Sequence, residues 1–510
     1  MTHLSWLDWL VIVVYALGML AVGWYYSRRT ATTEDYLLGG RKMKPFGVGL
    51  SLFASLLSTI SYLAWPGEMI KYGPLFMLGA IAAYPFIYLV AGWLMIPYIM
   101  KLKVTSAYEI LEPLGSGVRL LGSFLFLSLR LAWMGVIIYA TADKVLRPLM
   151  GWPDEATPGV CIVLGAITVI YTSMGGLRAV VLTDAVQTLI LFGGAVLSLI
   201  LVTVYLGGVS VWWPTEWLAH WPEPVWGYAP GVRITFFGGF LATFTWYVCT
   251  CGSDQMAVQR YLATRDVKTA RSVLGISLVA NTLVTAVMMS VGLAVWAYFR
   301  ANPPSLPQGA TLLGDADQLF PRFVAIGMPM GLSGLIVAGL LAAAMSSLSS
   351  GVNSSCSVIT VDFIDRFRRR RTSEMDHVRL AKYVSVVVGV VVVALSSAVG
   401  MVEGNLLEVA FKVVNLLTAP LFGLFFMAMF VRWATGPGTL VGAACGLIVV
   451  VTINYWAELR GIPGVRSIIL SLEDSMGTEG ISFLWAMPLS LLVQVVVGML
   501  VSLVPIGRRR

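Results

Sequence analysis

The stretch AAAMSSLSSGVNSS, residues 342–355, decides how the whole chain is interpreted. It lies in a long apolar segment from Gly331 to about Phe363, yet it carries six serine hydroxyls and one asparagine amide. A helix in lipid is normally built from apolar side chains, because unpaired polar groups are costly there. These oxygen atoms therefore indicate either close helix packing or a bound ligand.

The spacing of these polar residues favours one helix face. Positions i, i+3, i+4 and i+7 are occupied by Ser346, Ser349, Ser350 and Asn353. On an α-helix such positions lie on the same side. Neutral oxygens gathered in this way suit a hard monovalent cation. The alternative is that small residues allow helices to pack closely, with hydroxyls bonded to their own helix.

Composition places the whole chain in a membrane. The 510 residues are 58% hydrophobic and only 12% charged, about half the charged share of soluble proteins. Apolar stretches of roughly 20 residues, long enough to cross a bilayer as helices, recur from end to end. Residues 1–510 are therefore expected to form a single all-α polytopic membrane domain. We expect about 13 spans, at 6–26, 46–70, 73–99, 120–145, 158–174, 181–207, 234–259, 270–299, 330–363, 379–401, 406–431, 437–457 and 482–506.

The loop charges predict the orientation. Most of the 34 Lys and Arg residues fall in alternate loops, which are the inner ones if the N-terminus is outside. This positive-inside bias predicts an outer N-terminus and a cytoplasmic C-terminus, with multiple passes through the inner membrane. The basic run in DRFRRRRTSE (365–374) is expected to be a solvated loop near anionic lipid and not a nucleic-acid site.

Two spans carry further signs of a binding site. The second span, GVGLSLFASLLSTISYLAWPGEMI (47–70), is rich in small and hydroxyl residues and contains Pro66 and Gly67. Broken helices expose backbone carbonyls that can coordinate ions. Asp184 lies inside the sixth span, and a carboxylate at membrane depth is by default a functional hypothesis.

Several motifs in order resemble the sodium:solute symporter family. They are FASLLSTIS (53–61), LKVTSAYEILE (102–112), YTSMGGLRAVVLTDAVQ (171–187), SDQMAVQRYLATRDVKTA (253–270) and GLLAAAMSSLSSGVNSS (339–355). The resemblance spans nearly the whole chain. It implies a LeuT-type fold with inverted five-helix repeats at 46–207 and 234–431. An extra helix at 6–26 and further helices at 437–506 would flank the repeats. It also implies alternating access coupled to inward sodium flow.

The resemblance further implies which residues bind sodium. A main sodium site would use the carbonyls of Ala54, Leu57 and Ala343 with the hydroxyls of Ser346 and Ser347. Some family members hold a second sodium ion with an aspartate and three serines. Those positions correspond here to Asp184, Ser346, Ser349 and Ser350. One or two sodium ions are therefore expected.

The expected solute pocket departs from family members with known solutes. Met134 stands where a sialic acid carrier would place an arginine, and Ala80 where it would place a glutamine. Lys412 could hold a carboxylate, although it could also snorkel outward or pair with an acidic residue. The expected pocket residues are Leu56, Ser58, Ser61, Ala80, Tyr84, Met134, Asp254, Gln255, Lys412 and Asn415.

The sequence thus predicts a sodium-coupled symporter that imports a small organic solute, either carboxylate-bearing or sugar-like. Proton coupling on the same fold is the nearest alternative, with Asp184 as the titrating group. A solute sensor or transceptor is another. An enzyme is not expected, because the spans contain no paired carboxylates, nucleophile with a base, or His/Cys metal spacing. The partners expected are the solute, Na⁺ and the lipid bilayer, with a monomeric chain.

Overall fold

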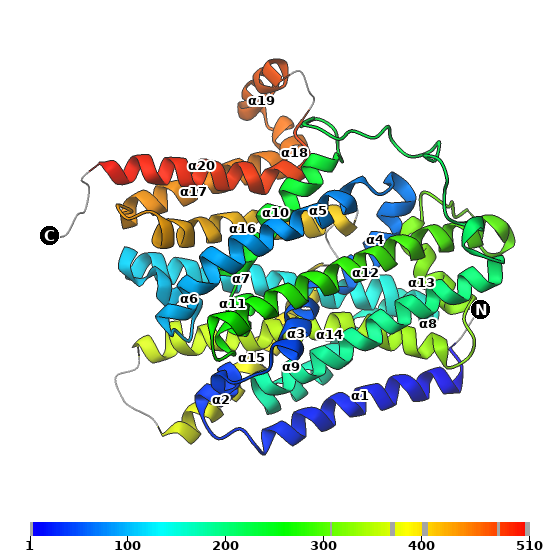
Figure 1. The fold of residues 1–510 in the computed structure, drawn as a ribbon, viewed down its shortest axis with the longest axis horizontal. Helices are drawn as coiled ribbons and strands as arrows, with labels where there is room; N and C mark the ends of the chain where they lie inside the picture. The colour runs from blue at the N-terminus through cyan, green and yellow to red at the C-terminus, as the bar shows by residue number, and fades with distance from the viewer. Residues whose placement is uncertain (1–3, 307–308, 368–372, 400–405, 477–479, 505–510) are drawn as a thin grey trace.

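A computed structural model describes residues 4–306, 309–367, 373–399, 406–476 and 480–504. Within these ranges the regular structure is helical. Most of the long helices run roughly along the longest axis of the molecule (Figure 1). Helix α1 begins at one end of this axis, and the last helix, α20, finishes at the opposite end.

The long helices are the following. Their bounds are α1 Trp6–Ser27, α3 Pro45–Leu56, α4 Thr59–Tyr72, α5 Leu75–Val90, α7 Ser116–Ala140, α9 Thr157–Leu206, α10 Phe236–Ser253, α12 Val267–Ala301, α14 Leu332–Val358, α15 Glu374–Val399, α16 Leu406–Phe430, α17 Gly436–Asn454 and α20 Ala486–Leu503. Shorter helices are α2 Thr33–Leu38, α6 Ile96–Leu102, α8 Arg147–Met150, α11 Gln255–Leu262, α13 Ala316–Ile326, α18 Trp456–Arg460 and α19 Pro463–Met476.

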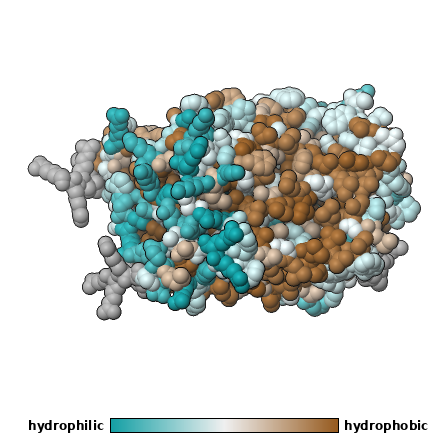
Figure 2. All heavy atoms as spheres, turned by 60° about the horizontal axis from the view of Figure 1, so that its bottom comes forward, coloured by the Kyte–Doolittle hydropathy of each residue, from teal (hydrophilic) through white to brown (hydrophobic). Residues whose placement is uncertain are grey.

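Nine helices in the described part of the chain are long and apolar enough to cross a membrane. A tenth span results if the bent pair α3 and α4 is counted as one. An apolar belt covers the middle of the face in Figure 2, and hydrophilic side chains gather at one end. The predicted spans 158–174 and 181–207 follow one another within α9 as two helical stretches, separated by a kink with non-helical torsions at Gly176. The total of thirteen membrane spans therefore stays a prediction.

Two helices are broken where the sequence placed small and polar residues. Helix α3 ends at Leu56, and Leu57 and Ser58 take extended torsions before α4 begins, with an angle of 68° between the two helices. Helix α10 ends at Ser253, Asp254 is extended, and α11 follows. The Asp254 carboxylate caps α11 by accepting from the Met256 amide at 2.8 Å. Each break leaves backbone groups without a helical partner.

Helix α14 occupies the centre of the bundle. Every residue from Ala342 to Val358 is buried, although this stretch holds all six serines of residues 342–355. It packs against α9, α3, α7, α15, α11 and α1. Because no lipid reaches these hydroxyls, each must find its partner inside the protein.

One end of the bundle is closed by polar contacts around α2. The Tyr36 hydroxyl donates to the Ser173 carbonyl at 3.0 Å, and Arg178 pairs with Asp35 at 2.7 Å. The Gln259 amide donates to the Leu37 carbonyl at 2.5 Å. Nearby in the chain after α14, Asp362 pairs with Arg119 at 2.5 Å. We call this region, built from α2, Arg178, Gln259 and the Arg119–Asp362 pair, the sealed end.

The break in α9 yields a stability prediction. Gly176 has φ 60° and ψ −158°, and a Cβ there would lie 2.6 Å from the Tyr36 carbonyl oxygen. That backbone region is essentially restricted to glycine and costs other residues about 1–3 kcal/mol. Gly176→Ala should therefore lower the thermal unfolding midpoint in detergent by several degrees.

Gly193→Ala is the matched control on the same helix, because a Cβ there meets nothing within 4 Å. Alanine is the better helix former, so this variant should keep or slightly raise the midpoint. Equal midpoints for the two variants would contradict the proposed role of Gly176.

Candidate functional site

The first cluster of oxygens forms where the break between α3 and α4 meets α14. The Ser346 hydroxyl lies 3.0 Å from the Ala54 carbonyl oxygen and 3.2 Å from that of Ala343. The Ser347 hydroxyl lies 2.8 Å from the Leu57 carbonyl oxygen. The five groups that the resemblance assigned to a main sodium site therefore lie at one interface as two hydrogen-bonded sets, and all five residues are buried.

This cluster can change from hydrogen bonding to cation binding with little rearrangement. Each serine hydroxyl donates to a carbonyl, but a hydroxyl proton rotates freely about its C–O bond. Once its proton has turned away, a hydroxyl oxygen can direct a lone pair at a cation. A cavity of about 10 Å³ adjoins Ala54, Leu57, Ala343 and Ser346 but not Ser347, and the surface that it exposes is apolar. That volume accommodates about one water-sized particle.

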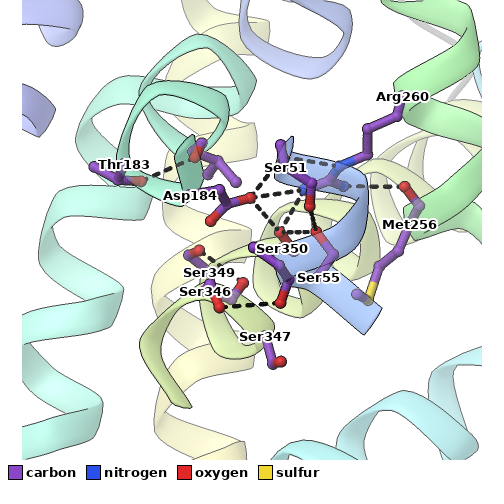
Figure 3. Close-up of polar contacts among 12 residues, drawn as sticks. Ser51, Ser55, Thr183, Asp184, Met256, Arg260, Ser346, Ser347, Ser349 and Ser350 are labelled. Atoms are coloured by element: carbon purple, nitrogen blue, oxygen red, sulfur yellow. Dashed lines mark hydrogen bonds and ion pairs between the residues drawn. The ribbon is translucent and has the colours of Figure 1, made fainter. Parts of the chain in front are cut away.

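The second cluster surrounds Asp184 on α9. Its Oδ2 atom accepts from the Ser51 hydroxyl at 2.6 Å and from the Ser350 hydroxyl at 3.2 Å. Its Oδ1 atom is buried and has no hydrogen-bond partner among the described residues. In Figure 3 this second oxygen is directed away from Ser51, toward the side on which Ser349 lies. A buried carboxylate oxygen without a donor is unusual and suggests a missing ligand.

Sequence reasoning missed the cationic member of this cluster, Arg260. Its guanidinium is fully buried and lies 3.4 Å from Asp184 Oδ2. It also donates to the Met256 carbonyl at 3.0 Å and contacts the Ser350 hydroxyl (Figure 3). The signal that could have found it is the arginine in SDQMAVQR (253–260), which directly follows a predicted membrane stretch. An arginine at that depth requires an anionic or carbonyl partner.

Ser349 and Ser55 complete the polar face. The Ser349 hydroxyl donates to the Ser346 carbonyl at 3.1 Å within α14, as the packing alternative predicted for serines in general. The Ser55 hydroxyl lies 2.7 Å from the Ser350 hydroxyl and 2.6 Å from the Ser51 carbonyl. The two clusters thus lie next to each other along α3 and α14, and α9 and α11 contribute to the second one.

A cavity of about 140 Å³ lies beside the break in α3 and α4. Residues from α4, α5, α7, α10 and α12 line it, together with Val414 of α16. Its lining is Leu56, Leu57, Ile60, Ser61, Trp65, Phe76, Met77, Ala80, Tyr84, Trp133, Thr243, Trp246, Tyr247, Asn281, Thr285 and Val414. None of these lining residues is charged. The walls are aromatic, with a few amide and hydroxyl groups.

Comparison with known proteins identifies the family. The model of the sodium:solute symporter family matches residues 36–446, most of the chain. The chain belongs to the sodium:solute symporter family. It is therefore a membrane-embedded, multi-pass transporter in which sodium is the coupling ion, as the motifs predicted.

Individual relatives of this symporter cover almost its full length. The sodium/sialic acid symporter SiaT of Proteus mirabilis is 31% identical over 92% of this chain and 94% of its own. Human sodium-coupled monocarboxylate transporter 1 is 30% identical over 92% of this chain and 77% of its own. The rabbit sodium-dependent multivitamin transporter is also 30% identical, over 92% and 72%.

Solved structures confirm the LeuT-type fold that the motifs implied. A Na⁺-coupled sialic acid symporter in a substrate-bound, outward-open state superposes with a TM-score of 0.80 at 26% identity, covering 98% of both chains. The nucleobase-cation-symport-1 transporter Mhp1 superposes with a TM-score of 0.53 at 15% identity over 92% of both chains. At that identity, the second match supports the fold alone.

The structure of this symporter brings only some of the predicted pocket residues together. Leu56, Ser61, Ala80 and Tyr84 line the 140 Å³ cavity. Asn415 donates to the Phe483 carbonyl at 3.3 Å, and the Ser58 hydroxyl faces that of Ser61 at 3.5 Å.

The other six predicted pocket residues do not line the cavity; they are Ser58, Met134, Asp254, Gln255, Lys412 and Asn415. Met134 is fully buried and packs against Gly351. Asp254 forms an ion pair with Arg130. The Gln255 amide donates to the Thr105 carbonyl at 3.0 Å, so this side chain links α11 to the segment around Thr105.

Lys412 points away from the cavity. Its ammonium lies 3.6 Å from the Glu458 carboxylate and 5.6 Å from the centre of the Tyr455 ring. This geometry matches the alternative in which the lysine pairs with an acidic residue. Sequence reasoning missed Trp133, Trp246, Tyr247, Asn281 and Thr285, because aromatic residues and isolated polar residues also fit an ordinary helix interface.

The first cluster gives a direct prediction. Ser346→Ala removes a hydroxyl that lies next to two carbonyls of the main cluster and borders the second one. A neutral ligand of a charged group contributes about 1.5–3 kcal/mol. The sodium concentration for half-maximal uptake should therefore rise about ten-fold or more.

Ser198→Ala serves as the matched control. The Ser198 hydroxyl is equally buried but only donates to the Gly194 carbonyl of its own helix, at 2.8 Å. Its sodium activation should match that of the parent. Unchanged activation in Ser346→Ala would remove that serine from the sodium site.

Proposed function

We propose that the main sodium ion binds between the carbonyls of Ala54, Leu57 and Ala343 and the hydroxyls of Ser346 and Ser347. The observation that carries this proposal is that these five buried groups lie at one interface, at the break in α3 and α4. Binding there would join the broken helix to α14. Sodium binding would thereby be coupled to the arrangement of the helices that also border the solute cavity.

A second sodium ion would bind between Asp184, Ser346, Ser349 and Ser350. Support comes from the unpartnered Oδ1 atom of Asp184, which is a free anionic ligand in a buried place. Arg260 occupies the other carboxylate oxygen, so the ion would approach from the opposite side. The Ser349 hydroxyl could rotate from its carbonyl partner toward the ion.

The second site gives a test of stoichiometry. Asp184→Asn keeps the size of the side chain but removes the anionic ligand. If two ions couple, the Hill coefficient for sodium should fall from near two toward one in uptake assays. Thr183→Val is the control, because the Thr183 hydroxyl bonds only to carbonyls of its own helix at 3.0 and 2.9 Å. An unchanged coefficient in Asp184→Asn would leave one ion and a structural Asp184–Arg260 pair.

We also propose that the solute binds in the 140 Å³ cavity and carries a carboxylate or sugar-like hydroxyls on a compact body. The volume is close to the roughly 150 Å³ that holds one benzene molecule. Aromatic walls suit an apolar face or a ring. Asn281, Tyr247 and Thr285 form a polar corner, in which the Asn281 amide contacts the Tyr247 hydroxyl and Thr285 lies 3.4 Å from Asn281.

The size and charge of the cavity favour a short monocarboxylate over a sialic acid. No lysine or arginine lines it, so a carboxylate would rely on neutral amide and hydroxyl donors. Arg130 lies one helical turn before Met134, the position where a sialic acid carrier would have an arginine, and it forms an ion pair with Asp254. The monocarboxylate and multivitamin transporters among the relatives make such solutes plausible chemistry for this fold.

We also propose a membrane location, an orientation, an oligomeric state and a repeat organisation for this symporter. The chain would sit in the inner membrane with its N-terminus outside, act as a monomer, and lack enzymatic activity. The inverted repeats would span 46–207 and 234–431, each with a broken first helix. Proton coupling through Asp184 is less favoured, because Arg260 pairs with that carboxylate. No observation specifically favours a sensor.

Uptake into proteoliposomes tests the solute proposal. A labelled panel of short monocarboxylates, sialic acids, sugars, polyols, amino acids and vitamins would be offered with an inward sodium gradient, and again with a proton gradient alone. We expect sodium-dependent accumulation of a monocarboxylate. Accumulation of sialic acid or a sugar instead would reject the assignment by size, and accumulation with protons alone would reject sodium coupling.

The same assay locates the solute. Asn281→Ala should raise the half-saturating solute concentration about ten-fold, since it removes an amide from the polar corner of the cavity. Lys412→Ala should leave that concentration unchanged, because Lys412 lies beside Glu458. The reverse result would return Lys412 to the solute site.

A further inference from the structure

Asn353 on α14 is a buried amide whose hydrogen-bonding capacity is unused. The residue is fully buried, and neither its amide nitrogen nor its oxygen has a hydrogen-bond partner among the described residues. Burying an unpaired amide is costly, so such groups normally hold a ligand or a water molecule. Neither the sodium sites nor the solute cavity proposed above uses this residue.

Asn353 continues the row of sodium-binding oxygens along α14. It stands seven residues after Ser346 and three after Ser350. At about 100° per residue it lies within roughly 20° of the Ser346 direction. At about 1.5 Å per residue it lies about 4.5 Å further along the axis than Ser350. The polar face therefore extends one turn beyond both sodium clusters.

That further turn leads toward the sealed end. After α14 the chain passes through a π-helical segment, Ile359–Asp365, which carries Asp362 and its partner Arg119. Helix α11 also packs against α14 and contributes Gln259, whose Oε1 is another buried oxygen without a partner. Asn353 thus lies between the sodium clusters and the contacts that close this end.

The solute cavity takes a different direction. Its lining comes from α4, α5, α7, α10, α12 and α16, with Leu56 and Leu57 at the break, and includes no residue of α14. The buried face of α14 that carries Asn353 is therefore not part of the solute cavity.

We propose that Asn353 is a transient station for a sodium ion leaving the Asp184 cluster toward the sealed end. The proposal rests on the sodium sites described under Proposed function. The amide oxygen would be a neutral ligand for the ion, and the amide nitrogen would hold water that travels with it. Because the station has no carboxylate of its own, it holds the ion weakly, as a point of passage requires.

The test separates ion release from ion binding. Asn353→Leu is close in size but offers no ligand. With sodium outside only, net solute uptake requires sodium release and should fall five-fold or more. With saturating sodium on both sides, solute exchange does not require release and should stay within two-fold of the parent. The external sodium concentration for half-maximal uptake should also stay within two-fold.

A second variant tests the same proposal by strengthening ion binding at residue 353 instead of removing the ligand. Asn353→Asp would hold the ion more tightly, so sodium inside the vesicle should inhibit uptake at a several-fold lower concentration than in the parent. This readout remains available if Asn353→Leu does not fold. No change in internal sodium inhibition would overturn the station.

Asn454→Leu is the matched control. Asn454 is also buried with an unpartnered oxygen, but it lies on α17 and donates to the Lys412 carbonyl at 3.3 Å. It should keep the ratio of net uptake to exchange. Equal loss of uptake and exchange in Asn353→Leu would show a packing role and overturn the proposal. A wrong assignment of the sodium sites would give a different result, because Ser346→Ala would then show normal sodium activation.

Discussion

The contact between the serine face of α14 and the broken helix α3–α4 is the constraint on which the rest of the structure depends. Hydroxyls at Ser346 and Ser347 meet carbonyls that only a break can expose, at Ala54 and Leu57. In lipid such carbonyls would be too costly, so the break must be enclosed by protein. The complete burial of α14 provides that enclosure.

The Asp184–Arg260 pair adds a second requirement to the same region. Both side chains are fully buried, and removing either would leave an uncompensated charge. The pair ties α9 to α11, the second half of the other broken helix. The two helix breaks of the fold are thus connected through α14, which contacts both α3 and α11. A change at the ion clusters can therefore reach both broken helices through direct contacts.

The sequence allowed the helical membrane fold to be predicted, because apolar length and spacing are local patterns. The family resemblance pointed to the residues of the first oxygen cluster, whose hydrogen bonds the structure shows. Apolar length marks the spans, and the spacing of Ser346, Ser349 and Ser350 marks a helix face. The solute cavity was harder to predict, since its residues come from seven helices and depend on how those helices pack. Lys412 seemed suited to a carboxylate, but its partner Glu458 lies far along the chain. Arg130 and Asp254 likewise neutralise each other, which spacing alone could not reveal.

The charge of the Asp184–Arg260 pair has a consequence for energetics. Because the carboxylate and the guanidinium cancel, each sodium ion bound at the proposed sites would add a full positive charge to the buried region. Moving one charge across a membrane potential is worth about 2.3 kcal/mol per 100 mV. Two sodium ions carried with one monovalent anion would move one net charge, so the voltage of the cell, and not the sodium gradient alone, would drive accumulation. One sodium ion with the same anion would leave the carrier insensitive to voltage.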